Sequence, residues 1–143
     1  MIHEIGIYIN GVLLTNRTYY NSPSLKTDRD LICALISAVE VFYKTTFSQE
    51  LEYLKGKHHI LVYSKKIIKN INTNESFHVV AYAIAKNKSF SLESYVEVQI
   101  RPKLEELLKT FEFNYGGYNI ETMYKIPDFT HEIDEIFAEI KYI

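Results

Sequence analysis

The sequence has one cysteine, five glycines and no long apolar run among its 143 residues. A lone Cys33 cannot form an intramolecular disulfide, so we expect a domain that folds without one, in a reducing, cytoplasmic setting. Cys33 lies within an apolar helical pattern, which favours a small buried hydrophobe over a reactive thiol. The longest strongly apolar stretch, residues 31–39, is far short of the roughly 20 residues that cross a bilayer, and it predicts no direct membrane insertion.

No charge of one sign dominates the chain, because 16 Lys and Arg face 18 Asp and Glu. The net charge of -2 provides no general field that would collect phosphates, which argues against nucleic acid as a partner. Apolar residues make up 47% of the chain, and a domain of this size buries roughly 70% of the surface of its unfolded chain. We therefore expect one folded domain over residues 1–143.

The first part of the chain predicts a β-hairpin followed by a helix. Isoleucines alternate over residues 5–9, and Asn10-Gly11 separates them from the apolar residues 12–15, which is a strong hairpin signal. The segment Thr27-Asp28-Arg29-Asp30 resembles a capping box, so a helix is expected to begin there and to end near Phe47.

Three strands are expected next, and the first of them has the pattern of an edge strand. Residues 48–55 and 58–66 predict a second hairpin about Gly56, and residues 77–85, apolar on both faces, predict a central strand. Around Leu51 and Tyr53 the pattern is mixed, as at the edge of a sheet, where unpaired amides can bind the same strand of a second copy. A blunted edge that stays solvated is the alternative.

Two helices are expected at the end of the chain. Apolar residues recur at helical spacing over residues 91–111 and again over 129–140. Pro102 predicts a kink in the first of these helices because proline cannot donate its amide and crowds the preceding turn. The predicted order of elements is therefore β-β-α-β-β-β-α-α, an α+β fold.

The familiar catalytic and ligand-binding motifs are missing. Lys88-Ser89 lacks the upstream glycines of a P-loop, and Gly116-Gly117 has no strand-to-helix context for a dinucleotide site. The segment 131–135 has Glu135 where a zinc-protease helix carries its second histidine, and adjacent His58 and His59 point to opposite faces of a strand. We expect no catalytic residue, no cofactor and no metal, while carboxylates that pair only in space stay open.

The first helix has more apolar surface than one sheet face needs. A narrow polar stripe runs along it, made of Arg29, Cys33, Ser37, Glu40 and Lys44. The apolar remainder spans roughly 220°, whereas a helix lying on a sheet needs a little over about 100°. One or both flanks, Ile36 with Tyr43 or Ala34 with Val41, are therefore expected to meet another surface. Coverage of these flanks within the monomer is the alternative.

The order of elements over the whole chain resembles the longin family, close kin of the roadblock domains. Local similarities lie in Ile7-Tyr8-Ile9-Asn10-Gly11, in Glu50-Leu51-Glu52-Tyr53-Leu54 before His59-Ile60-Leu61-Val62-Tyr63, and in residues 129–136. The resemblance implies an α/β sandwich, a five-stranded antiparallel sheet with the first helix on one face and the last two on the other.

The resemblance also implies a non-enzymatic role. Longin and roadblock proteins typically pair through the first helix and the third strand, as homodimers or heterodimers, and the platform engages small Ras-like GTPases in signalling or membrane traffic. The matching residues here are Ile36, Tyr43, Leu51 and Tyr53, with Glu40 and Lys44 placed to set partner choice. Charged replacements of Ile36 and Tyr43 are then expected to yield a folded monomer.

A small-molecule sensor of the PAS or GAF kind is the alternative function. Its pocket would be lined by side chains such as Tyr63 and Tyr82. Three consecutive strands after a single helix count against it, because such domains usually carry several helices between strands. An uncharacterised enzyme is a third possibility that no motif supports.

Overall fold

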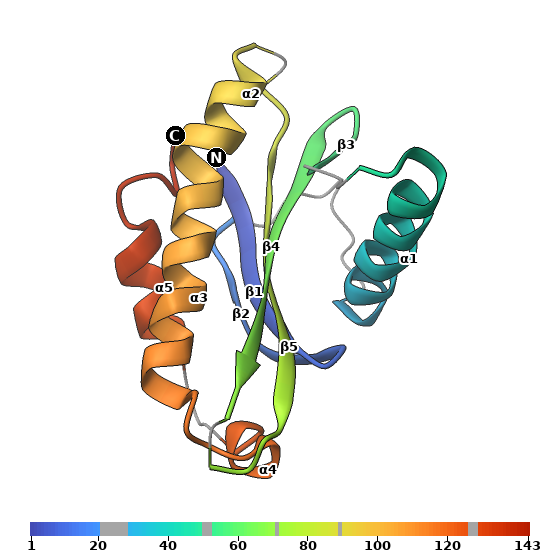
Figure 1. The fold of residues 1–143 in the computed structure, drawn as a ribbon. Helices are drawn as coiled ribbons and strands as arrows, with labels where there is room; N and C mark the ends of the chain where they lie inside the picture. Colours follow the sequence, from blue (N-terminus) through green and yellow to red (C-terminus); the bar gives the residue numbers. More distant parts are fainter. Residues whose placement is uncertain (21–28, 50–52, 71, 89, 126–128) are drawn as a thin grey trace.

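The computed structural model describes residues 1–20, 29–49, 53–70, 72–88, 90–125 and 129–143 (Figure 1). In chain order, the elements are β1 (Ile2–Ile9), β2 (Val12–Thr18), α1 (Arg29–Phe47), β3 (Tyr53–Lys55), β4 (His59–Lys69), β5 (Ser76–Lys86), α2 (Leu92–Ser94), the π-helix η1 (Tyr95–Ile100), α3 (Arg101–Tyr115), α4 (Ile120–Met123) and α5 (Thr130–Phe137). All strand pairs of the sheet are antiparallel, in the order β2-β1-β5-β4-β3. The predicted α+β fold and five-stranded sheet are confirmed.

The first hairpin turns at the predicted Asn10-Gly11 pair. Asn10 and Gly11 have φ angles of 48° and 83°, and Ile9 pairs with Val12 across the turn. Two successive residues in the left-handed region suit the twist of the flanking strands, and asparagine and glycine tolerate that region best. The Asn10 side chain also accepts a hydrogen bond from the His78 amide at 2.9 Å, which ties the turn to β5.

The central strand is β5, as its doubly apolar sequence predicted. It pairs with β1 on one side and with β4 on the other. Its alternating side chains enter two separate core clusters, so that Ala83 packs on the face of α3 and α5 and Tyr82 on the face of α1. Figure 1 shows α1 on one side of the sheet and the last helices on the other. Helices on both faces explain why this strand has no polar side.

The helix before Pro102 is irregular, and the irregularity takes the form of a π-helical turn. The segment Leu92–Tyr115 runs from α2 through η1 into α3 without a break. At the end of η1 the Arg101 amide donates to the Val96 carbonyl, five residues back. Pro102, in the first turn of α3, has no amide to donate. The sequence predicted a kink at Pro102, and the feature that the structure has at this place is a π-helical turn directly before it.

The edge position expected for the strand after α1 is confirmed. The described part of that strand is short, Tyr53–Lys55, and it pairs only with β4 within the order of the sheet. Tyr53 is half-buried and packs against the larger core cluster, on the side of α3. Leu51 lies outside the described residues.

Two histidines meet where β1 and β4 begin. The rings of His3 and His59 are 4.9 Å apart, edge to face, and His3 is 3% exposed. Burial lowers the pKa of both imidazoles. A hydrogen bond from His3 Nδ1 to the Tyr20 carbonyl opposes the shift for His3. The positive charge of His59 lowers the pKa of His3 further, and that of His58 lowers the pKa of His59. The folded protein therefore resists protonation of this pair.

We expect the free energy of unfolding to fall as the pH drops below about 6.5, the ordinary pKa of histidine. The pKa values of His3 and His59 are lower in the folded state, so the unfolded chain binds more protons below this pH. Above this pH both states are deprotonated, and the two histidines no longer reduce the free energy of unfolding. Urea denaturation at several pH values measures the slope. His3→Gln should flatten the slope.

Candidate interaction surface

Helix α1 packs on the sheet through its isoleucines and part of its polar stripe. Ile32, Cys33 and Ile36 are buried in the smaller core cluster, against aromatic side chains of the sheet. Beside them, the Glu40 carboxylate contacts the Lys65 ammonium of β4 at 2.5 Å, and only 18% of the Glu40 side chain is exposed. This ion pair lets a carboxylate lie on the side of the helix that faces the sheet.

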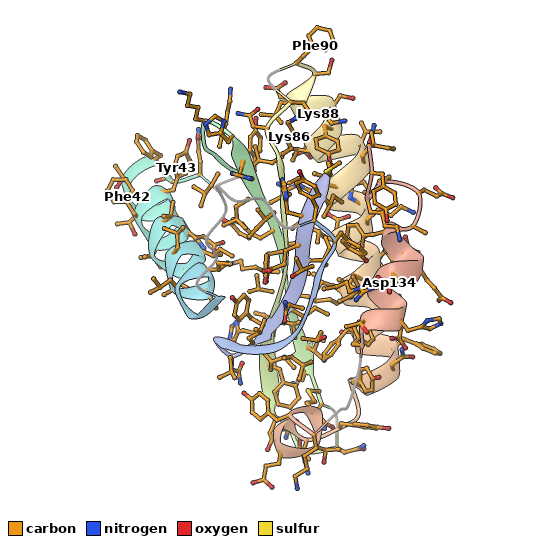
Figure 2. The ribbon with its side chains drawn as sticks, turned by 180° about the vertical axis from the view of Figure 1, so that it is seen from behind. Phe42, Tyr43, Lys86, Lys88, Phe90 and Asp134 are labelled. Atoms are coloured by element: carbon orange, nitrogen blue, oxygen red, sulfur yellow. The ribbon has the colours of Figure 1, made fainter. Side chains whose placement is uncertain are left out.

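The side of α1 away from the sheet is apolar. The name outer stripe is used below for Leu31, Ala34, Leu35, Ala38, Val41 and Phe42. All six are exposed, and the four large side chains, Leu31, Leu35, Val41 and Phe42, are 63%, 49%, 65% and 62% exposed. Figure 2 shows Phe42 on the outer side of the helix. The sequence predicted the flank of Ala34 and Val41 as one of two candidate contact surfaces, and in the structure both residues are exposed.

The spacing along the outer stripe suits a second helix. Leu31, Leu35, Ala38 and Phe42 follow one another at intervals of four, three and four residues. This is the alternation that forms the contact seam of paired helices, with Ala38 as a small residue that permits close approach. The surface is therefore apolar and also arranged in the register that a partner helix can fill.

The prediction that Ile36 contacts a partner is wrong. Ile36 is 2% exposed within the single chain, because it packs under α1 against the sheet. A charged replacement there would disrupt the core instead of producing a folded monomer. Tyr43 is half-buried, and its ring lies 4.9 Å from that of Phe47 on the same helix. The helical pattern showed the width of the apolar arc, but not that Ile32 and Ile36 face the sheet with Glu40 beside Lys65.

The remaining predicted contact residues are dispersed. Glu40 is turned to the sheet and paired with Lys65, whereas Lys44 is exposed near the end of α1. Tyr53 packs on the opposite sheet face from α1, and Leu51 is outside the described residues. The structure therefore brings no more than Lys44 and part of Tyr43 near the outer stripe. Leu31, Leu35 and Phe42 are the residues that sequence reasoning did not single out, although their spacing was readable.

The thiol, imidazole and carboxylate groups outside the outer stripe have no arrangement typical of a catalytic or metal site among the described residues. Burial raises the pKa of the Cys33 thiol, although a hydrogen bond with Ser37 opposes the shift, so the less reactive thiol form is favoured. His131 Nε2 and Glu135 Oε1 form an exposed contact of 2.9 Å. Among the described residues, no three His, Cys, Asp or Glu side chains converge as metal ligands.

Asp134 acts as a tie between β2 and α5. It accepts hydrogen bonds from the Tyr19 hydroxyl at 2.6 Å and from Arg17 Nε at 3.1 Å, and Figure 2 labels it on the helix. Burial, followed by the bond to Asp134, raises the pKa of Tyr19. This carboxylate was one of those that could pair only in space, and its partners are a phenol and a guanidinium, which hold two elements together.

The two tyrosines named for a sensor pocket lie in the core. Tyr63 and Tyr82 are buried in the cluster beneath α1, and the Tyr82 hydroxyl donates to Glu4 Oε2 at 2.5 Å. In the described ranges, no helix combines the length and the apolar character that crossing a bilayer requires. Comparison of the sequence with protein-family models and with curated proteins finds no match.

Proposed function

We propose that this chain is a non-catalytic interaction module that dimerises through the outer stripe of α1 and, as a dimer, binds or regulates a small Ras-like GTPase. The observation that carries the first step is the outer stripe itself. Single exposed apolar side chains are ordinary on soluble proteins, but a contiguous apolar patch marks a contact surface. Four large apolar side chains here share one helix face and are at least 49% exposed.

Burial of this surface offers enough free energy to drive pairing. Taking one large aliphatic or aromatic side chain from full exposure to full burial contributes about 1.5–3 kcal/mol. The four side chains of each copy are between 49% and 65% exposed, so each would contribute roughly half of that amount. This sum is comparable with the translational, rotational and side-chain entropy that association costs. Another longin-like or roadblock-like chain with a similar helix face is an equivalent partner. The short edge strand β3 is a second surface that such a pair can use.

The GTPase step is supported by the family resemblance in the order of elements and by the α+β sandwich. This resemblance is a likeness of fold. The described side chains form no nucleotide-binding loop of their own. In this proposal the module contributes surface, and the GTPase contributes the nucleotide chemistry.

We expect the unmodified protein to have a light-scattering mass near twice the 16.8 kDa of one chain, and Leu35→Glu with Phe42→Glu to reduce it to one chain. Charges on the outer stripe would be desolvated without partners in the dimer but solvated in the monomer. A pull-down from extract of the native host should retain a Ras-like GTPase on the unmodified protein and lose it with the double variant.

The control is Phe113→Glu, which places one such charge on an aromatic position of α3 that is 90% exposed, against 62% for Phe42. It should leave both the mass and the retained GTPase unchanged. Far-ultraviolet circular dichroism should show all variants folded. A mass of one chain for the unmodified protein would overturn dimerisation between two copies.

A further inference from the structure

A second surface feature is a cleft at the end of the sheet where β1 and β4 begin and β5 ends. Its volume is about 870 Å³, within the range of small-molecule sites. The basic and aromatic-nitrogen side chains along it are His3, Lys57, His58, His59, Lys86 and Lys88. Figure 2 shows Lys86 and Lys88 at this end of the molecule, away from Phe42.

The sheet topology brings these residues together from three separate segments. His59 of β4 is paired directly with Lys86 of β5, and the His3 ring of β1 lies 4.9 Å from the His59 ring. The amide of Asn87 donates to the His58 carbonyl at 2.9 Å, which fixes the chain beyond β5 beside the β3–β4 turn. The Asn87 side chain donates to the Gly56 carbonyl at 2.8 Å in the same turn. A backbone hydrogen bond and a side-chain hydrogen bond from Asn87 thus hold the walls of the cleft together.

The described lining residues contribute one carboxylate, at Ile143, against the ammonium groups of Met1 and of three lysines. None of the described lining residues is Asp or Glu. Glu4, which follows His3 in the sequence, is buried and accepts hydrogen bonds from Tyr82 and Thr18. At the rim, the Met1 amino group donates to an Ile143 oxygen, and the Lys88 ammonium lies 4.2 Å from the centre of the Tyr95 ring.

Two lysines in the middle of β4 are paired with carboxylates. Lys65 is paired with Glu40 and Lys66 with Glu112. The whole chain has more acidic than basic residues, so an unbalanced basic cluster comes from placement and not from composition. Lysines and histidines that converge without acidic side chains are the groups that recognise oxyanions.

The histidines are consistent with a cleft that is completed by an anion. Nε2 of His3 is buried in the floor without a hydrogen-bond partner. Burial, and then the positive charges of His59, the Met1 amino group and Lys86, lower the pKa of His3. A bound anion would offset these positive charges and favour protonated imidazoles.

We infer that this cleft binds the phosphate group of a small phosphorylated molecule. Lys57, Lys86 and Lys88 supply positive charge around the phosphate, and His58 and His59 supply ring N–H donors. His3 supports the ring of His59 from beneath. None of these residues belongs to the outer stripe of α1, so the cleft and the proposed dimer surface can be tested separately.

The test is a nuclear magnetic resonance titration of the full chain with inorganic pyrophosphate, at an ionic strength held constant with sodium chloride. Saturable shifts are expected in the His58 and His59 imidazole signals and in the Lys86 and Asn87 amides. Lys86→Gln should weaken binding at least about tenfold, the usual effect of losing one charge-assisted contact. Lowering the pH from about 7.5 to about 6 should strengthen binding, because protonation of His3 and His59 adds positive charge to the cleft.

The matched control is Lys69→Gln, which removes the same charge from an exposed lysine at the far end of β4. It should change the affinity by less than about twofold, since Lys69 is remote from the cleft. Lys57→Gln, in the exposed turn before β4, is a second variant if Lys86→Gln fails to fold. Shifts that do not saturate by about 10 mM, or equal weakening by Lys69→Gln and Lys86→Gln, would overturn the proposal.

Discussion

Replacing Ile36 by aspartate should lower the free energy of unfolding by about 4 kcal/mol. Ile36 is buried between α1 and the sheet, in a cluster with Ile32, Tyr63 and Tyr82. The change removes an isoleucine side chain from this cluster and puts an unpaired carboxylate in its place. Urea denaturation followed by circular dichroism measures the loss, and detachment of α1 should expose the tyrosines to solvent.

The control for this variant is Leu35→Asp, one residue earlier on the same helix. Leu35 belongs to the outer stripe and is half exposed, so its replacement should change the stability of the monomer by no more than about 0.5 kcal/mol. Adjacent positions on a helix point about 100° apart, which makes this pair a direct test of the rotation of α1. Equal losses at both positions would contradict the orientation described above.

Gly6→Ala should destabilise the protein by about 3 kcal/mol or more. A methyl group at Gly6 would lie 2.5 Å from both Cζ and the hydroxyl oxygen of Tyr82, which is closer than side-chain atoms can approach. Tyr82 is fully buried and cannot swing into solvent. Its displacement would also break the 2.5 Å hydrogen bond to Glu4, itself almost fully buried. Chemical denaturation of the variant gives the free energy directly.

A double-mutant cycle separates this contact from a backbone effect. In a Tyr82→Leu background the ring is gone, so Gly6→Ala should cost at least about 1 kcal/mol less than in the unmodified protein. Gly117→Ala is the matched control, because a methyl group there meets no atom within 4 Å. If Gly6→Ala costs the same in both backgrounds, close packing of Tyr82 on β1 is not the reason for glycine at this position.

For α1, the helical pattern predicted the width of the apolar surface but not which side of the helix packs on the sheet. The excess of apolar surface was readable from residues 31–42, and a flank of the helix is indeed open. The flank that packs on the sheet carries Ile32 and Ile36, and Glu40 beside them is compensated by the ammonium of Lys65, about 25 positions away in the sequence. A wheel of one helix contains no information about such a distant partner.

The basic cleft shows the same limit more strongly. His58 and His59 were expected to be ordinary strand residues, because neighbours on a strand cannot converge on one ion. That expectation considered β4 alone, whereas His3 and Lys86 arrive from β1 and β5 through strand pairing. Net charge also concealed the cluster, since acidic residues elsewhere cancel it in the sum.

The amino-acid sequence by itself determined the order of elements, the turn at Asn10-Gly11, the central place of β5 and the surplus apolar surface of α1. These features follow from local backbone preferences and from hydrophobic periodicity, which neighbouring residues carry together. Only the tertiary structure decided the rotation of α1, the enclosure of Ile36 and the convergence of lysines and histidines at one end of the sheet. These depend on contacts and charges between residues far apart in the chain, and such pairs are formed by packing.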